Sequence, residues 1–194
     1  MTHLLTNRFA VAIASAILAD WDGGGATNDW DDLVNWTGDA FNNNDVARFL
    51  NVDTGVTTNL SAFATNLGGL WYQNTAGTHT TDLQGGTLNF NNNGSLYTGE
   101  SVATSTAILK SGTIDLANNS NIRVGMRSSA TGIGNLTLGQ SGETLALTSN
   151  NIDEFFIGHN DTNADSATGT LDLTHATGTL DMSTNFQPRI GFGK

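Results

Sequence analysis

The feature that most constrains the fold of this chain is a short motif that recurs four times. It reads Gly-Thr-apolar-x-apolar, with Asn three residues after the second apolar position, and its third copy has Glu in place of Gly; the copies begin at Gly86, Gly112, Glu143 and Gly178. Each copy leads into a short apolar run that closes at Gly99, Gly125, Gly158 or Gly191. These glycines are spaced by 26, 33 and 33 residues (99 to 125, 125 to 158, 158 to 191). Periods of this length indicate stacked structural repeats.

Apolar and polar residues alternate within each motif, which is the period of a strand with one buried face. We expect the following apolar residues to face inward: Leu88, Phe90, Ile114, Leu116, Leu145, Leu147, Leu180 and Met182. Between them, Asn89, Asp115, Ala146 and Asp181 face outward. Another strand precedes each motif and a third closes in glycine. The sequence therefore predicts an all-β fold, a parallel β-helix (β-solenoid) with about three short strands per coil.

Asn and Thr recur at fixed positions of the motif, where they predict two structural ladders between coils. Asn tolerates positive φ, and its side-chain amide can bond to an equivalent amide one coil away. The expected Asn ladder consists of Asn93, Asn119, Asn150 and Asn185. The expected Thr ladder consists of Thr87, Thr113, Thr144 and Thr179.

The first 19 residues have the pattern of a secretory signal peptide. Arg8 precedes an apolar, alanine-rich run over 9–19, which is too short to cross a bilayer, since about 20 residues are needed. We expect cleavage after Ala19, with Ala14-Ser15-Ala16 as the other small-residue candidate. Residues 20–50 are then expected to form a Trp-rich N-terminal cap. Residues 51–194 would form the solenoid, with clear repeats over 79–191 and a truncated C-terminus.

Charge and cysteine content exclude several classes of function. Eighteen acidic and seven basic residues give a formal charge of −11, which argues against binding nucleic acid or anionic membranes. The chain has no cysteine, so disulfides, thiolate metal sites and cysteine nucleophiles are excluded. We expect no cofactor, and no membrane span once the signal is removed.

The N-terminal segments and the repeats together resemble a known kind of protein. The segments are Trp21-Asp22-Gly23-Gly24-Gly25, Asp29-Trp30, Asn35-Trp36 and Asn44-Asp45-Val46-Ala47-Arg48-Phe49. They resemble the mature N-terminus of autotransporter-like β-strand-repeat surface proteins, which occur in bacteria that carry PEP-CTERM-type exported proteins. Residues 131–138 and 157–173 are similar to the repeat unit of that family. The resemblance implies export, a parallel β-helix, attachment through a C-terminal element, and a role as passenger or stalk at the outer cell surface.

Tryptophans are the main candidates for ligand binding. Trp21, Trp30 and Trp36 suit a sugar-stacking platform, because aromatic faces bury a large area against apolar surfaces. They equally suit a cap over the exposed strand edges at a solenoid end, which is the interpretation we favour. Trp71 is a fourth binding candidate, with packing as its alternative.

Charged residues offer two further hypotheses, an active site and a calcium site. Arg123 and Arg189 are expected at equivalent outward positions with Phe156 between them, as on a polysaccharide lyase, and Asp115 and Asp181 as a glycosidase-like pair. Solvated surface charge is the alternative for all of them. Asp161 and Asp165 are candidate calcium ligands, because their oxygens suit a hard cation. No known calcium-binding motif surrounds them, so a polar loop is the interpretation we favour.

The expected function is that of a non-catalytic, exported structural or adhesive solenoid. Its expected partner is an extracellular polysaccharide or a cell-surface component, and end-to-end self-association is a third hypothesis. The competing interpretation is a carbohydrate-active β-helix enzyme or a sugar-binding module. A clustered arginine and acid groove with a bound cation would favour the enzyme.

Overall fold

The computed structural model describes residues 17–60, 66–100, 104–126, 131–160 and 167–190, and all inferences below concern these residues. Almost all regular structure in them is β-strand. One short 3₁₀ helix, η1 (Leu33–Asn35), lies in the N-terminal segment.

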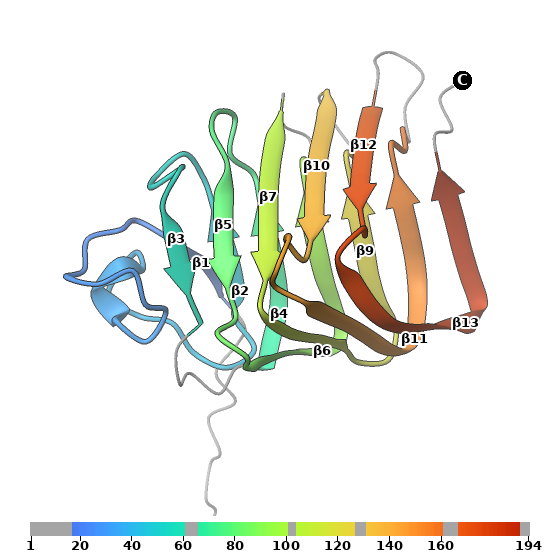
Figure 1. Cartoon of the computed structure of the whole chain (residues 1–194), viewed down its shortest axis with the longest axis horizontal. Coiled ribbons are helices and arrows are strands. Elements are labelled where there is room, and N and C mark those ends of the chain that lie inside the picture. The colour runs from blue at the N-terminus through green and yellow to red at the C-terminus, as the bar shows by residue number, and fades with distance from the viewer. Residues whose placement is uncertain (1–16, 61–65, 101–103, 127–130, 161–166, 191–194) are drawn as a thin grey trace, which may run out of the picture.

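The strands form two parallel sheets that run along the length of the molecule (Figure 1). The larger sheet contains β1 (Leu18–Asp20), β2 (Val46–Phe49), β4 (Asn66–Tyr72), β6 (Thr87–Thr98), β8 (Gly112–Leu116), β9 (Ser120–Val124), β11 (Leu145–Ile157) and β13 (Ala176–Ile190). The smaller contains β3 (Thr57–Asn59), β5 (His79–Asp82), β7 (Ser105–Lys110), β10 (Gly132–Leu138) and β12 (Ala167–Asp172). From β2 onward the chain passes back and forth between the two sheets and always advances in one direction. The predicted all-β parallel β-solenoid is therefore confirmed, with about five turns.

The predicted three strands per coil are seen separately in the coil made by β7, β8 and β9. In neighbouring coils the second and third strands are joined into one long, bent strand, as in β6, β11 and β13. β9 pairs with the second half of both β6 and β11, so the joined and separate forms occupy the same place in the stack.

The interior is filled by the apolar residues that alternation assigned to it. Leu88, Ile114 and Leu145 are fully buried, and Phe90 and Leu147 are nearly so. Leu180 is half-buried, and the side chain of Met182 lies outside the described set. The predicted outward residues of these strands are all more exposed than their inward neighbours. The predicted inward and outward faces of the motif strands are therefore confirmed wherever the structure describes the side chain.

The alignment of the four motifs was wrong by two residues in the last two copies. Thr87 pairs with Thr113 as expected, but Thr113 then pairs with Ala146, and Ala146 with Thr177. Thr144 precedes β11, and Thr179 pairs with Thr148, so neither continues the Thr87–Thr113 column. A slip of two residues leaves every side chain on the same face because strand side chains have period two. This is why the faces are right although the register was wrong.

Two of the four residues of the expected Asn ladder lie at left-handed corners. Asn93 and Asn119 have φ of 64° and 58°, and Asn44 adopts the same left-handed conformation at the corresponding corner of an earlier coil. Asn150 instead lies within β11, where a register shift between Ser149 and Ile152 takes up the extra residue. Its neighbour Asn151 donates its side-chain amide to Asn119 Oδ1 at 3.3 Å. The side chain of Asn185 lies outside the described set.

Closing glycines form left-handed corners, and at two of them a side chain would not fit. Gly99, Gly125 and Gly158 have φ of 71°, 64° and 64°, and Gly191 lies outside the described residues. A Cβ on Gly99 or Gly125 would overlap the carbonyl of the facing small-sheet strand, β10 or β12. The two sheets therefore meet at this corner by direct backbone approach, which only glycine permits.

The folded region begins before the boundary that the signal-peptide pattern indicated. Ala19 is 1% exposed, and Leu18, Ala19 and Asp20 pair in register with Val46, Ala47 and Arg48 of β2. β1 and β2 both belong to the larger sheet. Cleavage after Ala19 would therefore remove two of the three residues of β1.

His79 is a buried titratable group in the core and leads to a testable pH dependence. Burial lowers its pKa, although the bond to the Leu50 carbonyl and the charge of Asp53 oppose that shift. A lowered pKa means that the folded state favours neutral His79, so its contribution to stability is complete above the ordinary histidine pKa of about 6.5 and is lost as the pH falls from there through the lowered pKa of the folded state. We expect the free energy of unfolding to decrease as the pH falls below about 6.5, and His79→Phe to flatten that slope in urea unfolding. An unchanged slope in the variant would contradict this.

Candidate functional site

The three N-terminal tryptophans are buried and form the end of the core. Trp21, Trp30 and Trp36 are at most 1% exposed, and Trp36 stacks on Phe41 with ring centroids 4.0 Å apart. Their indole N–H groups donate to Asp53 Oδ2, Thr58 Oγ1 and the Trp30 carbonyl. Rings packed in this way offer no free face to a sugar. This burial argues against a sugar platform at these three residues and agrees with packing at the end of the solenoid.

A continuous column of arginine and aromatic side chains crosses the outer face of the larger sheet. We call it the aromatic–arginine column; strand pairing places its members in the order Asp20, Arg48, Trp71, Tyr97, Arg123, Phe156 and Arg189. Each member comes from the next coil. The predicted equivalence of Arg123, Phe156 and Arg189 is confirmed. Trp71, half-buried, belongs to the same column.

From Trp71 to Arg189, neighbouring members of the column lie over one another. Trp71 and Tyr97 are nearly parallel, with centroids 5.5 Å apart. The Arg123 guanidinium carbon lies 4.7 Å from the Tyr97 ring centre and 5.7 Å from that of Phe156, and Arg189 lies 5.2 Å from Phe156 on the other side. Such cation–π contacts contribute about 0.5–2 kcal/mol each, more when desolvated. The column therefore links the coils through side chains as well as backbone.

Acidic side chains pair with two arginines of the column and compensate their positive charge. Asp20 binds Arg48 through two hydrogen bonds of 2.6 and 2.8 Å. Arg123 bonds to Glu154 at 2.9 Å and lies 3.5 Å from Glu100. Burial alone would lower the pKa of Arg123, but Tyr97 and these two glutamates raise it. Arg123 therefore keeps its positive charge and is already paired with Glu154. This part of the column is suited to joining coils.

Replacing Arg123 by lysine tests this linking role. Lysine keeps the charge but lacks the planar group that lies over Tyr97 and bonds to Glu154. We expect Arg123→Lys to lower the free energy of unfolding by about 1–2 kcal/mol, from loss of the stacked contact and one charge-assisted bond. Urea unfolding measures it, with Lys110→Arg as the reverse exchange at a site without stacking. Equal stability of Arg123→Lys and wild type would contradict the role.

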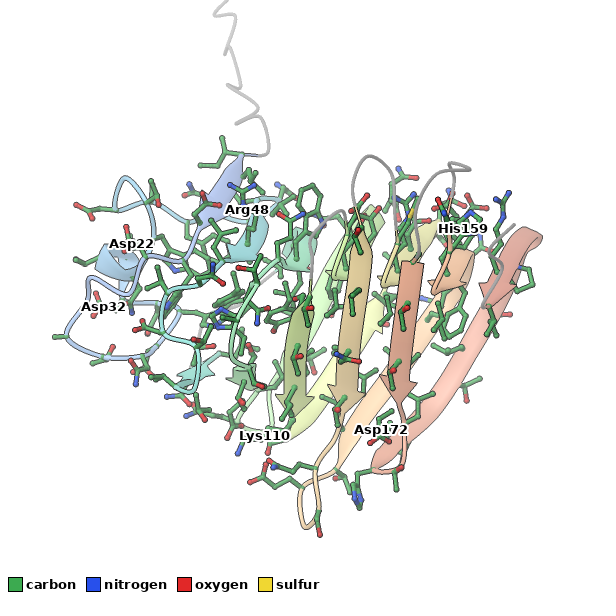
Figure 2. The ribbon with its side chains drawn as sticks, turned by 90° about the horizontal axis from the view of Figure 1, so that it is seen from above. Asp22, Asp32, Arg48, Lys110, His159 and Asp172 are labelled. Carbon is green, nitrogen blue, oxygen red and sulfur yellow. The ribbon has the colours of Figure 1, made fainter. Side chains whose placement is uncertain are left out.

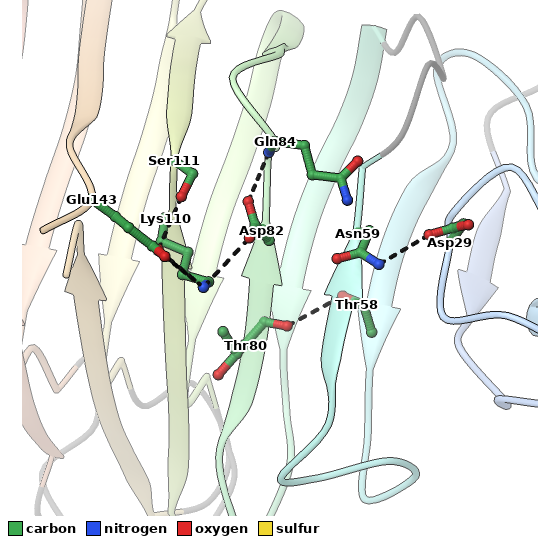
Figure 3. Close-up of polar contacts among 9 residues, drawn as sticks. All are labelled: Asp29, Thr58, Asn59, Thr80, Asp82, Gln84, Lys110, Ser111 and Glu143. Atoms are coloured by element: carbon green, nitrogen blue, oxygen red, sulfur yellow. Dashed lines mark hydrogen bonds and ion pairs between the residues drawn. The ribbon is translucent and has the colours of Figure 1, made fainter.

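A second set of polar contacts follows the corner of the smaller sheet, on the side of the molecule opposite Arg48 and His159 (Figure 2). Asn59, Asp82 and Lys110 occupy one outward column, and Lys110 lies 3.4 Å from Asp82 and 3.0 Å from Glu143 (Figure 3). Lys110 also donates a hydrogen bond to Glu143 Oε1 at 3.2 Å, and the Ser111 hydroxyl donates one to Glu143 Oε2 at 3.0 Å. The bond from Lys110 lowers the pKa of Glu143, and the same bond raises that of Lys110.

Two adjoining open depressions lie beside this corner and together form a shallow groove with a mixed polar and apolar lining. Their volumes are about 480 and 370 Å³, and both are lined by Gly142, Glu143, Thr144 and Thr177. The short antiparallel bridge between Gln140 and Glu143 lies at this point. Further hydroxyls come from the neighbouring coils: Ser111, Thr113 and Thr174. A surface rich in hydroxyls with few charges is suited chemically to a polyhydroxylated ligand.

Other predicted site residues are not brought together. Asp115 pairs with Thr148 and accepts its hydroxyl at 3.1 Å, while Thr148 pairs with Thr179, so Asp181 is two residues away from the expected equivalent position. The calcium candidates Asp161 and Asp165 lie outside the described residues. Within the described ranges, no group of three or more His, Asp or Glu side chains is placed to hold a metal ion.

The sequence did not reveal that Arg48 and Tyr97 belong to the column, or that Glu100 and Glu154 pair with it. Their spacing differs from coil to coil, so only the strand register shows that they are neighbours. The groove was missed for the same reason, because its hydroxyls come from three corners of different length.

Together, the stacked coils and their outer columns define a parallel β-solenoid with a side-chain-linked outer face. Comparison with family models, with curated proteins and with solved structures finds no match to this chain. The described part of the chain contains no helix with the length and apolar character needed to cross a bilayer.

Proposed function

We propose that this protein is a non-catalytic, exported structural or adhesive β-solenoid, a passenger or stalk of a bacterial surface protein. The observation that carries the proposal is the aromatic–arginine column, which continues through the larger sheet from Asp20 to Arg189. Outer side chains that stack and pair from coil to coil stiffen a rod. In an enzyme, the same arginines and acids would need to be free to contact substrate.

An extracellular polysaccharide is the proposed partner of the adhesive surface. The hydroxyl-lined groove around Glu143 and Thr177 supports this choice, because it crosses several coils and can follow an extended polymer. The acidic balance of the chain disfavours a strongly anionic polymer through repulsion.

Beads that carry the purified protein test adhesion and catalysis together. They are washed over films of neutral and uronate-containing polysaccharides, and the length of the polymer is measured before and after contact. We expect retention on a neutral film with the polymer length unchanged. Newly formed chain ends would overturn the proposal in favour of the enzyme. Beads that wash off like beads coated with an unrelated acidic protein would also overturn it.

End-to-end association is a second proposal, supported by the last described coil. Leu173 and Ile190 are 42% and 60% exposed there, and Leu171, Ala176 and Leu180 are only partly covered. β12 and β13 each pair on one side only within the described residues. Sedimentation over a range of concentrations tests it: a mass that stays at 20.3 kDa, less any removed signal, would contradict association.

A further inference from the structure

The N-terminal edge of the fold contains a buried carboxylate that contacts a backbone nitrogen. Asp45 is 3% exposed, and its Oδ1 accepts a hydrogen bond from the backbone nitrogen of Ile17 at 2.9 Å. Its Oδ2 accepts one from the backbone nitrogen of Asn42, also at 2.9 Å. No cationic side chain of the described residues forms an ion pair with Asp45. A buried carboxylate held only by neutral donors is costly unless a positive charge compensates it.

The nitrogen that Asp45 contacts lies directly after a small-residue cleavage pattern. Ala14-Ser15-Ala16 follows a basic residue and an apolar run, and the next residue is Ile17. Hydrolysis of the bond between Ala16 and Ile17 would convert this amide nitrogen into an α-ammonium group with three donors and a unit positive charge. The carboxylate and the new charge would then be in contact without any movement of the strand.

We propose that the exported chain is cut after Ala16 and that the new α-ammonium of Ile17 forms a buried ion pair with Asp45, which fastens β1 to the solenoid. The cut is an ordinary hydrolysis by the signal peptidase of the exporting cell. Water supplies the oxygen for the Ala16 carboxylate and the protons for the Ile17 amine. The inference rests on the export that is part of the proposed function.

The pairing of β1 supports this site over the bond after Ala19. The Ile17 carbonyl accepts a hydrogen bond from the Val46 nitrogen at 2.8 Å, so the residue is held at both its nitrogen and its carbonyl. Cutting after Ala19 would remove these bonds together with the buried Ala19 side chain. Cutting after Ala16 keeps every contact of β1 and adds a charge where the carboxylate needs one.

The site of processing is tested by exporting the complete chain from a bacterial host and measuring the intact mass of the product. We expect a chain that begins at Ile17. A product that begins at Asp20 would overturn the inference while leaving export intact. A full-length chain that stays inside the cell would instead overturn the export on which the inference rests.

The ion pair is tested separately, on protein made without export. One chain, released from a cleavable fusion, begins at Ile17; the matched chain carries one extra glycine before it, which keeps the Ile17 amide but displaces the charge. We expect the extra glycine to lower Tm by about 3–6 °C, the range for loss of a charge-assisted bond in a domain of this size. Equal Tm values would overturn the ion pair, and this comparison needs no core substitution.

Asp45→Asn, combined with both N-termini, shows whether the effect passes through this carboxylate. In that background we expect the difference in Tm between the two chains to vanish. A difference that persists at full size would assign the effect of glycine to strain or to another partner, and would overturn the pairing with Asp45.

Discussion

Gly125→Ala is expected to lower the free energy of unfolding by about 3–5 kcal/mol, the sum of a left-handed backbone penalty and overpacking. Gly125 has φ of 64°, and a Cβ there would overlap the Thr168 carbonyl of β12. Neither the carbonyl nor the corner can move without disturbing the pairing of two coils. Urea unfolding followed by far-ultraviolet circular dichroism measures the change.

Gly142→Ala is the matched control for this prediction. Gly142 also has positive φ, at 84°, but nothing lies within 4 Å of the position that its Cβ would take. We expect the backbone penalty alone, about 1–2 kcal/mol. Similar losses in both variants would show that conformation, and not close approach of the two sheets, requires glycine at this corner.

Trp36→Ala is expected to cost about 3–5 kcal/mol, as for other buried aromatic truncations. Its ring lies between Phe41, Trp21 and Trp30, with centroid distances of 4.0, 5.2 and 5.6 Å, and its N–H satisfies the Trp30 carbonyl. Truncation would leave a cavity and an unpaired carbonyl at the end of the core. Urea unfolding, with tryptophan fluorescence to follow the cap, measures the loss.

Val34→Ala provides the control, because Val34 lies in the same cap but is 48% exposed. We expect its effect to stay within about 0.5 kcal/mol. If Trp36→Ala were equally mild, the aromatic cluster would not be what closes the solenoid end. If Trp36→Ala kept full stability but abolished retention on polysaccharide, the result would support sugar binding by the tryptophans.

The candidate surfaces were predictable only in part. Arg123, Phe156 and Arg189 could be matched from sequence because the same short strand closes in glycine in each of their coils. Arg48 and Tyr97 could not, since their coils differ in length and in the corners that precede them. Trp71 was identified as a candidate by residue type, but its stacking on Tyr97 depends on the pairing of β4 with β6.

The fold class and the inward face of the repeat strands could be predicted from local sequence alone. Both follow from local rules: alternation with period two survives a slip of two residues, and a left-handed corner favours glycine or asparagine wherever it occurs. The buried positions of Leu88, Ile114 and Leu145 needed nothing more.

The register, the burial of the tryptophans and the start of the folded region depend on contacts between residues distant in the chain. Register depends on how insertions are absorbed at corners, as at Ser149 to Ile152, and local sequence does not record this. Trp36 is buried because residues distant in the chain surround it. Ile17 and Ala19 resemble the end of a signal peptide, yet β2 provides backbone partners and Asp45 a carboxylate, which place them in the fold.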